Sequence, residues 1–153
     1  VNPMKKHRKY GGNIYKYCLP LCVISPSSII IHKEIFKDIG LFDENIPVCE
    51  DYDLWLRICS RYPVLYLQDK LIKKYGGHDD QLSRQYWGMD RFRIRALEKM
   101  INDPVLSEKD RMATVATAIN KARILKKGLM KHGREKEAEK MMKKLAELEN
   151  SYD

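Results

Sequence analysis

Hydrophobic and polar positions alternate along this chain with two different periods. Residues 14–17 alternate in character, and residues 27–31 are rich in β-branched apolar side chains, as in a buried strand. Residues 64–67 and 71–75 are two further short candidates on either side of a polar turn. These four segments predict strands of a sheet.

Other segments repeat their apolar residues at three- and four-residue spacing, which is typical of amphipathic helices. A short helix is predicted at residues 33–39, with Gly40 as its left-handed terminator. Longer helices are predicted at residues 51–62, where Pro63 follows, and at residues 83–102.

The last third of the chain has a purely helical pattern. Residues 107–132 and 134–150 are rich in Lys, Glu, Ala, Met and Leu and contain no strand signal. His132 and Gly133 interrupt the pattern between them. This arrangement predicts a helical hairpin.

Composition narrows the class of protein. The 153 residues are 44% hydrophobic and 33% charged, which suits a folded globular chain and excludes a disordered one. The formal net charge of +8 raises nucleic acid or an anionic membrane surface as partners, but acidic residues are interleaved with the basic ones. The four cysteines form no Cys-x-x-Cys pair, so we expect reduced, partly buried thiols rather than a zinc site.

The most informative feature is a run of acidic residues around a turn and a helix start. The sequence reads GLFDE at residues 40–44 and EDYDLWLR at residues 50–57. Unpaired backbone N–H groups and the helix dipole keep a carboxylate at a helix N-terminus ionised and oriented. Such a carboxylate can accept a proton from a substrate hydroxyl. The alternative is an ordinary N-terminal helix cap.

These residues resemble the acceptor-side signature of inverting glycosyltransferases of family 2. The family pattern reads roughly G-x-F-D-E, a short loop, E-D-x-D-L and an arginine one turn later, and every position is filled here. The resemblance implies an α/β fold, a partial Rossmann-like (GT-A-type) mixed sheet with flanking helices, and residues 1–103 are expected to form this acceptor-binding and catalytic half. The predicted C-terminal α-helical hairpin, residues 104–153, follows as an extension that has no such resemblance.

A complete enzyme of this family begins with a nucleotide-binding half that ends in an Asp-x-Asp-type motif. No such half is recognisable before Cys18, and no Asp-x-Asp precedes residue 51. The chain is therefore expected to be the C-terminal half of a longer enzyme and to be inactive alone. The implied reaction transfers a sugar from a nucleotide-diphosphate sugar to a hydroxyl of a glycan or lipid-linked acceptor, with inversion, in polysaccharide or cell-envelope glycan biosynthesis.

The resemblance assigns the role of catalytic base to Asp51. Glu50, Asp53 and Arg57 are expected to bind the acceptor or to support the base. Asp53 also stands four residues before Arg57, the spacing that favours an ion pair on a helix. Asp43 is expected to fix the turn that shapes the acceptor pocket.

Two residues outside this motif complete the candidate site. Trp87 is either an aromatic surface for a sugar ring or a core residue of the long helix. His78 resembles a family histidine that faces the metal and the leaving diphosphate, although Gly76 stands where the family has an arginine. The alternative for His78 is a surface-loop histidine. Mg²⁺ or Mn²⁺ is expected in the full enzyme, held mainly by the missing half.

The expected location is the cytoplasm, with peripheral contact at the inner face of the membrane. The apolar stripe of the hairpin suits a homodimer. No nucleic-acid-binding motif is present, so no specific nucleic acid partner is expected. The alternative to an enzyme is an interaction module whose basic hairpin binds an anionic partner, either RNA or a membrane surface.

Overall fold

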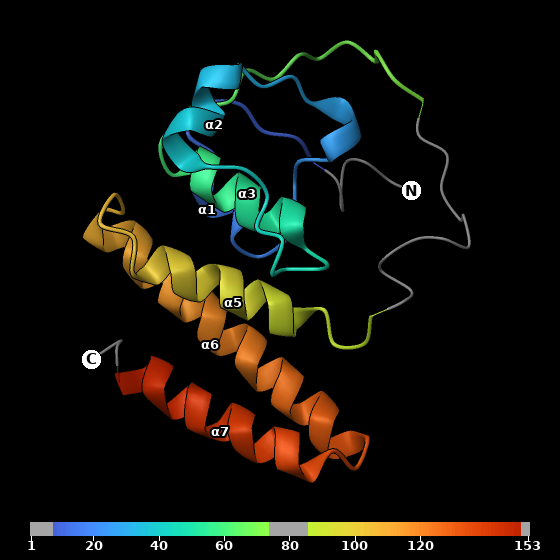
Figure 1. Ribbon diagram of the computed structural model, residues 1–153, viewed down its shortest axis with the longest axis vertical. Coiled ribbons are helices and arrows are strands. Elements are labelled where there is room, and N and C mark those ends of the chain that lie inside the picture. The colour runs from blue at the N-terminus through green and yellow to red at the C-terminus, as the bar shows by residue number, and fades with distance from the viewer. Residues whose placement is uncertain (1–7, 74–85, 151–153) are drawn as a thin grey trace. The chain divides into compact units, whose positions relative to one another are not determined.

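The protein is described here by a computed structural model that covers residues 8–73 and 86–150 (Figure 1). Within those ranges the chain forms six α-helices and one 3₁₀ helix. They are α1 (Tyr15–Cys18), the 3₁₀ helix η1 (Pro26–Ser28), α2 (Lys33–Ile39), α3 (Glu50–Cys59), α5 (Asp90–Ile101), α6 (Glu108–Lys131) and α7 (Glu135–Asn150). None of these helices is both long enough and apolar enough to cross a lipid bilayer.

The chain divides into two compact units, Val1–Trp87 and Gly88–Asp153, called below the N-terminal unit and the C-terminal unit. Helix α5 therefore belongs to the same unit as α6 and α7. The expected division between residues 103 and 104 rests on the change from a mixed to a purely helical sequence pattern there, and it stays a prediction.

The predicted α/β fold is wrong for the described residues, which contain helices but no strand and no sheet. Their only β-type pairing is an isolated bridge in which Gly12 and Val64 exchange two backbone hydrogen bonds, of 2.7 and 2.9 Å. A strand exists only where a neighbouring strand satisfies its backbone groups. No such neighbour is present along these segments, so their β-branched composition alone does not produce a sheet.

Two of the predicted strands show which structure the chain forms instead. The segment at residues 14–17 becomes α1, because the backbone N–H groups of Tyr17 and Cys18 both donate to the carbonyl oxygen of Ile14. In the segment at residues 27–31, η1 takes the first two residues and the backbone is extended at Ile29. The Ile30 side chain is 99% exposed, so this segment is not a buried strand.

The other two predicted strands lie in the segment of residues 64–73, which has no regular secondary structure and no β-type pairing beyond Val64. Leu65 is 86% exposed and Leu71 is 72% exposed. Residues 74 and 75 lie outside the described residues. This stretch therefore adds no layer to the fold.

The core of the N-terminal unit is built around α3. The predicted helix at residues 51–62 is observed as Glu50–Cys59, and its apolar face is buried as expected at Leu54, Trp55 and Ile58. Helix α2, predicted at the same residues, packs against that cluster with its own apolar side chains, which are those of Ile35, Phe36 and Ile39. Gly40 ends α2 with a φ of 77°, in the region that favours glycine.

Helix α6 lies between α5 and α7 in the C-terminal unit and packs against both (Figure 1). Ala96, Leu97, Ala118 and Ala122 are fully buried, and three of these four are alanines. The predicted hairpin helices are confirmed as α6 and α7. Gly133 makes the break between them, with a φ of 67°.

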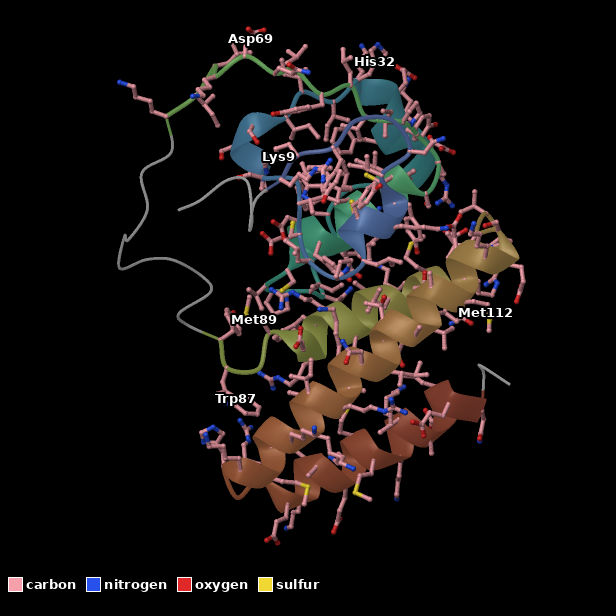
Figure 2. The ribbon with its side chains drawn as sticks, turned by 180° about the vertical axis from the view of Figure 1, so that it is seen from behind. Lys9, His32, Asp69, Trp87, Met89 and Met112 are labelled. Atoms are coloured by element: carbon pink, nitrogen blue, oxygen red, sulfur yellow. The ribbon has the colours of Figure 1, made fainter. Side chains whose placement is uncertain are left out.

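The long helix predicted at residues 83–102 begins later than expected. Helix α5 starts at Asp90, because Gly88 has a φ of 65° and interrupts the helical path. Trp87 and Met89 therefore lie ahead of the helix, on the segment that enters it (Figure 2). Residues 83–85 lie outside the described residues.

Candidate functional site

The N-terminus of α3 carries the acidic residues of the sequence motif. Glu50 and Asp51 are its first two residues, and Asp53 follows in the same turn. Cys49, which precedes the helix, has a φ of 64° and is the one non-glycine residue with positive φ in residues 8–73 and 86–150. A left-handed conformation costs such a residue about 1–2 kcal/mol. Backbone strain of this kind tends to occur at functional sites.

Asp51 is half-buried, and each of its carboxylate oxygens has a partner. Oδ1 accepts a hydrogen bond from the backbone N–H of Tyr52 at 2.7 Å. Oδ2 lies 3.3 Å from Sγ of Cys22, whose thiol donates to it. Each oxygen can accept a second hydrogen bond, so the carboxylate is oriented and still able to receive a proton.

Cys22 is a residue of this site that sequence reasoning missed. Burial raises the pKa of the Cys22 thiol, and the negative charge of Asp51 and the hydrogen bond to it raise it further. The thiol therefore keeps its proton at neutral pH and acts as a donor. The same sulfur lies 3.2 Å from the carbonyl oxygen of Ile24. Twenty-nine residues separate Cys22 from Asp51, and no motif in the sequence links the two.

Asp53 and Arg57 form the predicted ion pair. The Asp53 side chain is 1% exposed, and the Arg57 side chain is 13% exposed. Arg57 donates to Asp53 Oδ2 from Nε at 3.0 Å and from Nη2 at 2.8 Å. Such a pair, removed from water and doubly hydrogen-bonded, is geometrically rigid. It fixes the first turns of α3, and the expected role of these residues in acceptor binding stays a prediction.

Arg57 also joins the two halves of the sequence motif. Its Nη1 donates to the carbonyl oxygen of Ile39 at 2.5 Å, and its Nη2 donates to that of Leu41 at 2.8 Å. These carbonyls flank Gly40, at the end of α2. One guanidinium group therefore ties the turn at residues 39–41 to the helix that carries Asp51.

Asp43 shapes the turn that follows, as expected from its position. Its Oδ1 accepts hydrogen bonds from the backbone N–H of Asn45 at 2.9 Å and from the Asn45 side chain at 3.1 Å. The backbone N–H of Ile46 closes the turn on the Asp43 carbonyl at 2.9 Å. Phe42 does not anchor this turn, because its side chain is 44% exposed. The residue that anchors this turn is the buried Ile46.

Glu50 differs from the other carboxylates of the motif. It is half-buried at the first position of α3, and within the described part of the chain its side chain has no hydrogen-bond or ion-pair partner. Its carboxylate is therefore available to a ligand that approaches the helix N-terminus.

The two remaining candidates lie elsewhere in the chain. Trp87 is 37% exposed and lies before α5, so it is not a core residue of a helix there. His78 lies outside the described residues. Among residues 8–73 and 86–150, no three His, Cys, Asp or Glu side chains are arranged to hold a metal ion.

Comparison with known proteins gives a distant and partial similarity to uncharacterized glycosyltransferases of Rickettsia. The chain is 32% identical over 81 residues to one from Rickettsia typhi, which covers 53% of this chain and 25% of the relative. It is 36% identical over 69 residues to one from Rickettsia felis, which covers 44% of this chain and 11% of the relative. It is 30% identical over 73 residues to one from Rickettsia prowazekii, which covers 48% of this chain and 23% of the relative. The chain thus spans a quarter or less of these relatives.

No protein-family model matches the sequence, and no solved structure matches it. The relation is therefore to glycosyltransferases in general, without assignment to a family.

Proposed function

We propose that this chain is the acceptor-side part of an inverting glycosyltransferase, with Asp51 as the general base. The coarse part of this proposal is supported by the similarity to the Rickettsia proteins. The single observation that supports the finer part is the half-buried Asp51 carboxylate at the start of α3, held by the Tyr52 amide and the Cys22 thiol.

The proposed step is a displacement at the anomeric carbon of a nucleotide-diphosphate sugar. The acceptor oxygen forms the new C–O bond while the bond to the diphosphate breaks, and the electron pair leaves with the diphosphate. Asp51 takes the hydroxyl proton, which becomes acidic only as the oxygen gains positive character. A carboxylate, although a weak base, can therefore take this proton. Its two existing hydrogen bonds orient it at no further entropic cost during the reaction.

The neighbouring residues have supporting roles in this proposal. Glu50, with no partner in the described structure, binds a hydroxyl of the acceptor. Asp53, Arg57 and Asp43 are positioning residues, because they hold the helix start and the adjoining turns in place. Trp87 offers an exposed aromatic face to a sugar ring.

A divalent metal belongs to the proposal only for the whole enzyme. The described residues do not provide a set of metal ligands. Mg²⁺ or Mn²⁺ would be held mainly by residues outside this chain, with His78 as the one candidate that this chain contributes, and would stabilise the negative charge on the leaving diphosphate. Glycan or lipid-linked acceptors and a homodimer through the C-terminal helices also remain proposals.

The test compares Asp51→Asn with wild type in the full-length natural protein. Release of nucleoside diphosphate is followed over a panel of nucleotide sugars with Mg²⁺ or Mn²⁺. A general base contributes about 10²–10⁴-fold, so we expect the variant's kcat to fall at least about 100-fold while nucleotide binding is unchanged. Asp69→Asn is the matched control, because Asp69 is exposed on the extended segment (Figure 2) and should leave kcat unchanged.

Equal turnover by Asp51→Asn and wild type would reduce Asp51 to a helix cap. The 153-residue chain alone is expected to release no diphosphate from any donor, and turnover by it would contradict the proposal that it is one half of the enzyme. If the full-length protein turns over no donor and yet binds anionic partners, the interaction-module interpretation replaces the enzymatic one.

A further inference from the structure

The second half of α6 and the turn after it form an unusually basic stretch. Residues 111–134 contain no aspartate and no glutamate. The basic residues in this stretch are Arg111, Lys121, Arg123, Lys126, Lys127, Lys131 and Arg134. Helix α7 is different, because glutamates alternate with its lysines. The positive charge of the C-terminal unit is therefore concentrated on one helix and its end.

Part of this charge lies on one exposed face of α6. This face carries a set of residues whose successive members are one or three positions apart, which places them on one side of a helix: Arg123, Ile124, Lys127, Met130 and Lys131. All five are exposed. Ile124 is 54% exposed and Met130 is 60% exposed, so this face combines ammonium groups with two large apolar side chains. This face is called the basic-apolar face below.

Several of these cations are not neutralised within the described part of the protein. Lys126, Lys127 and Lys131 have no ion pair or hydrogen bond there. By contrast, Arg123 is 2.6 Å from Glu149, and the buried Lys121 is 3.4 Å from Asp90. The three unpaired lysines stand in the last two turns of α6, next to the turn into α7 (Figure 1).

We propose that the basic-apolar face, together with Lys126, docks on the surface of an anionic phospholipid bilayer. The lysines pair with lipid phosphates and carboxylates, and Ile124 and Met130 enter the boundary between headgroups and acyl chains. A helix that lies on a membrane has this combination of basic and apolar side chains. The inference stands apart from the proposed sugar transfer, because it uses no residue of α3 or its turn.

The exposed side chains of this face favour lipid over RNA as the occupant. Proteins that bind single-stranded RNA stack the bases on exposed aromatic side chains. This face has no aromatic residue. Exposed aliphatic side chains gain free energy when a bilayer removes them from water, whereas a phosphate backbone offers them no apolar environment.

The experiment measures co-sedimentation of the 153-residue chain with vesicles of phosphatidylcholine that contain about 30% phosphatidylserine, and with vesicles of phosphatidylcholine alone. The test variant replaces Lys126, Lys127 and Lys131 by glutamine. Each lysine near an anionic surface contributes about fivefold in affinity. We therefore expect the triple variant to bind the phosphatidylserine vesicles about 100-fold more weakly than wild type. Binding by wild type should also weaken steeply with salt.

The matched control replaces Lys109, Lys140 and Lys143 by glutamine. These three are exposed and unpaired in the described structure, but acidic residues stand close to each of them in sequence. Both triple variants remove three charges from the same net charge of +8. We expect the control to lose no more than about threefold, since screening limits the action of charges distant from the surface.

A third variant, Ile124→Ser with Met130→Ser, tests the apolar part of the proposal. We expect about a tenfold loss of vesicle binding with the salt dependence preserved. The proposal is overturned if the two lysine variants lose equal affinity, if wild type binds both kinds of vesicle equally, or if the serine variant binds as wild type does. It is also overturned if single-stranded RNA binds wild type more tightly than the anionic vesicles do, through the same three lysines.

Discussion

Replacing Arg57 should destabilise the N-terminal unit more than its position near the surface suggests. Its guanidinium makes four hydrogen bonds, two to Asp53 and one each to the carbonyl oxygens of Ile39 and Leu41. In Arg57→Met the Asp53 carboxylate would remain 1% exposed and lose its cation. Removal of one partner from a buried ion pair costs about 3–5 kcal/mol. The total stability of a domain is about 5–15 kcal/mol.

Two further variants separate the ion pair from the rest of the effect. Arg57→Lys keeps the charge but lacks the planar fork, so it cannot serve Asp53 and two carbonyls together, and it should cost about 1–3 kcal/mol. The double variant Asp53→Leu with Arg57→Met leaves no buried charge behind. It should be less destabilised than the sum of the two single variants by at least about 2 kcal/mol.

The assay is urea unfolding followed by tryptophan fluorescence. Trp55 is 2% exposed in the core that α3 builds, so its emission reports on this unit. Stability changes should appear as shifts of the midpoint at constant slope. A cost of 1 kcal/mol or less for Arg57→Met, or strict additivity in the double variant, would refute the view that Arg57 holds the turn to α3.

Three further outcomes follow from single positions. In thermal unfolding, Gly128→Ala should stabilise α6 by about 1 kcal/mol, whereas Gly133→Ala should destabilise the end of α6 by about 1 kcal/mol. An added Cβ meets nothing within 4 Å at either site, and only Gly133 has positive φ, so the two variants differ only in backbone conformation. The pKa values of Cys18, raised chiefly by a hydrogen bond with another thiol, and of Cys22, raised chiefly by burial, lie above the ordinary 9.0 in the folded chain. As the pH rises, the thiols of the unfolded chain therefore release their protons first. The free energy of unfolding should fall above pH 9 by about 1.4 kcal/mol per pH unit and thiol. If the plot of unfolding free energy against pH is the same in the double variant Cys18→Ala with Cys22→Ala, this expectation is contradicted. Asp51→Asn should speed alkylation of Cys22 at pH 8, because it removes a charge that raises the thiol pKa, and an unchanged rate would show that the two side chains do not interact.

The helices illustrate what a linear pattern can establish. The apolar spacing in residues 33–39 and the glycine after them describe α2 fully, because a helix satisfies its backbone within its own residues. The same holds for α6, α7 and the apolar face of α3. The Asp53–Arg57 pair was predictable for the same reason, since i,i+4 neighbours meet on any helix.

The predicted strands failed because a strand depends on residues elsewhere. The three isoleucines at residues 29–31 have the composition of a buried strand, yet no neighbouring strand pairs with them in the described residues, and Ile30 is 99% exposed. The late start of α5 has a different cause. Gly88 carries a positive φ there, and a glycine in a helical pattern does not reveal in advance whether it adopts a helical or a left-handed conformation.

The sequence by itself determined the helical segments, the acidic motif and the pairing of Asp53 with Arg57, because these depend on residues within a turn or two of one another. Only the tertiary structure decided that the Cys22 thiol meets Asp51, that Arg57 reaches the carbonyls around Gly40, and that Phe42 is partly exposed while Ile46 is buried. The contacts of Cys22 and Arg57 depend on how the chain folds back over intervals of 16 to 29 residues, often onto backbone atoms that every residue type shares. No pattern of side chains encodes such contacts directly.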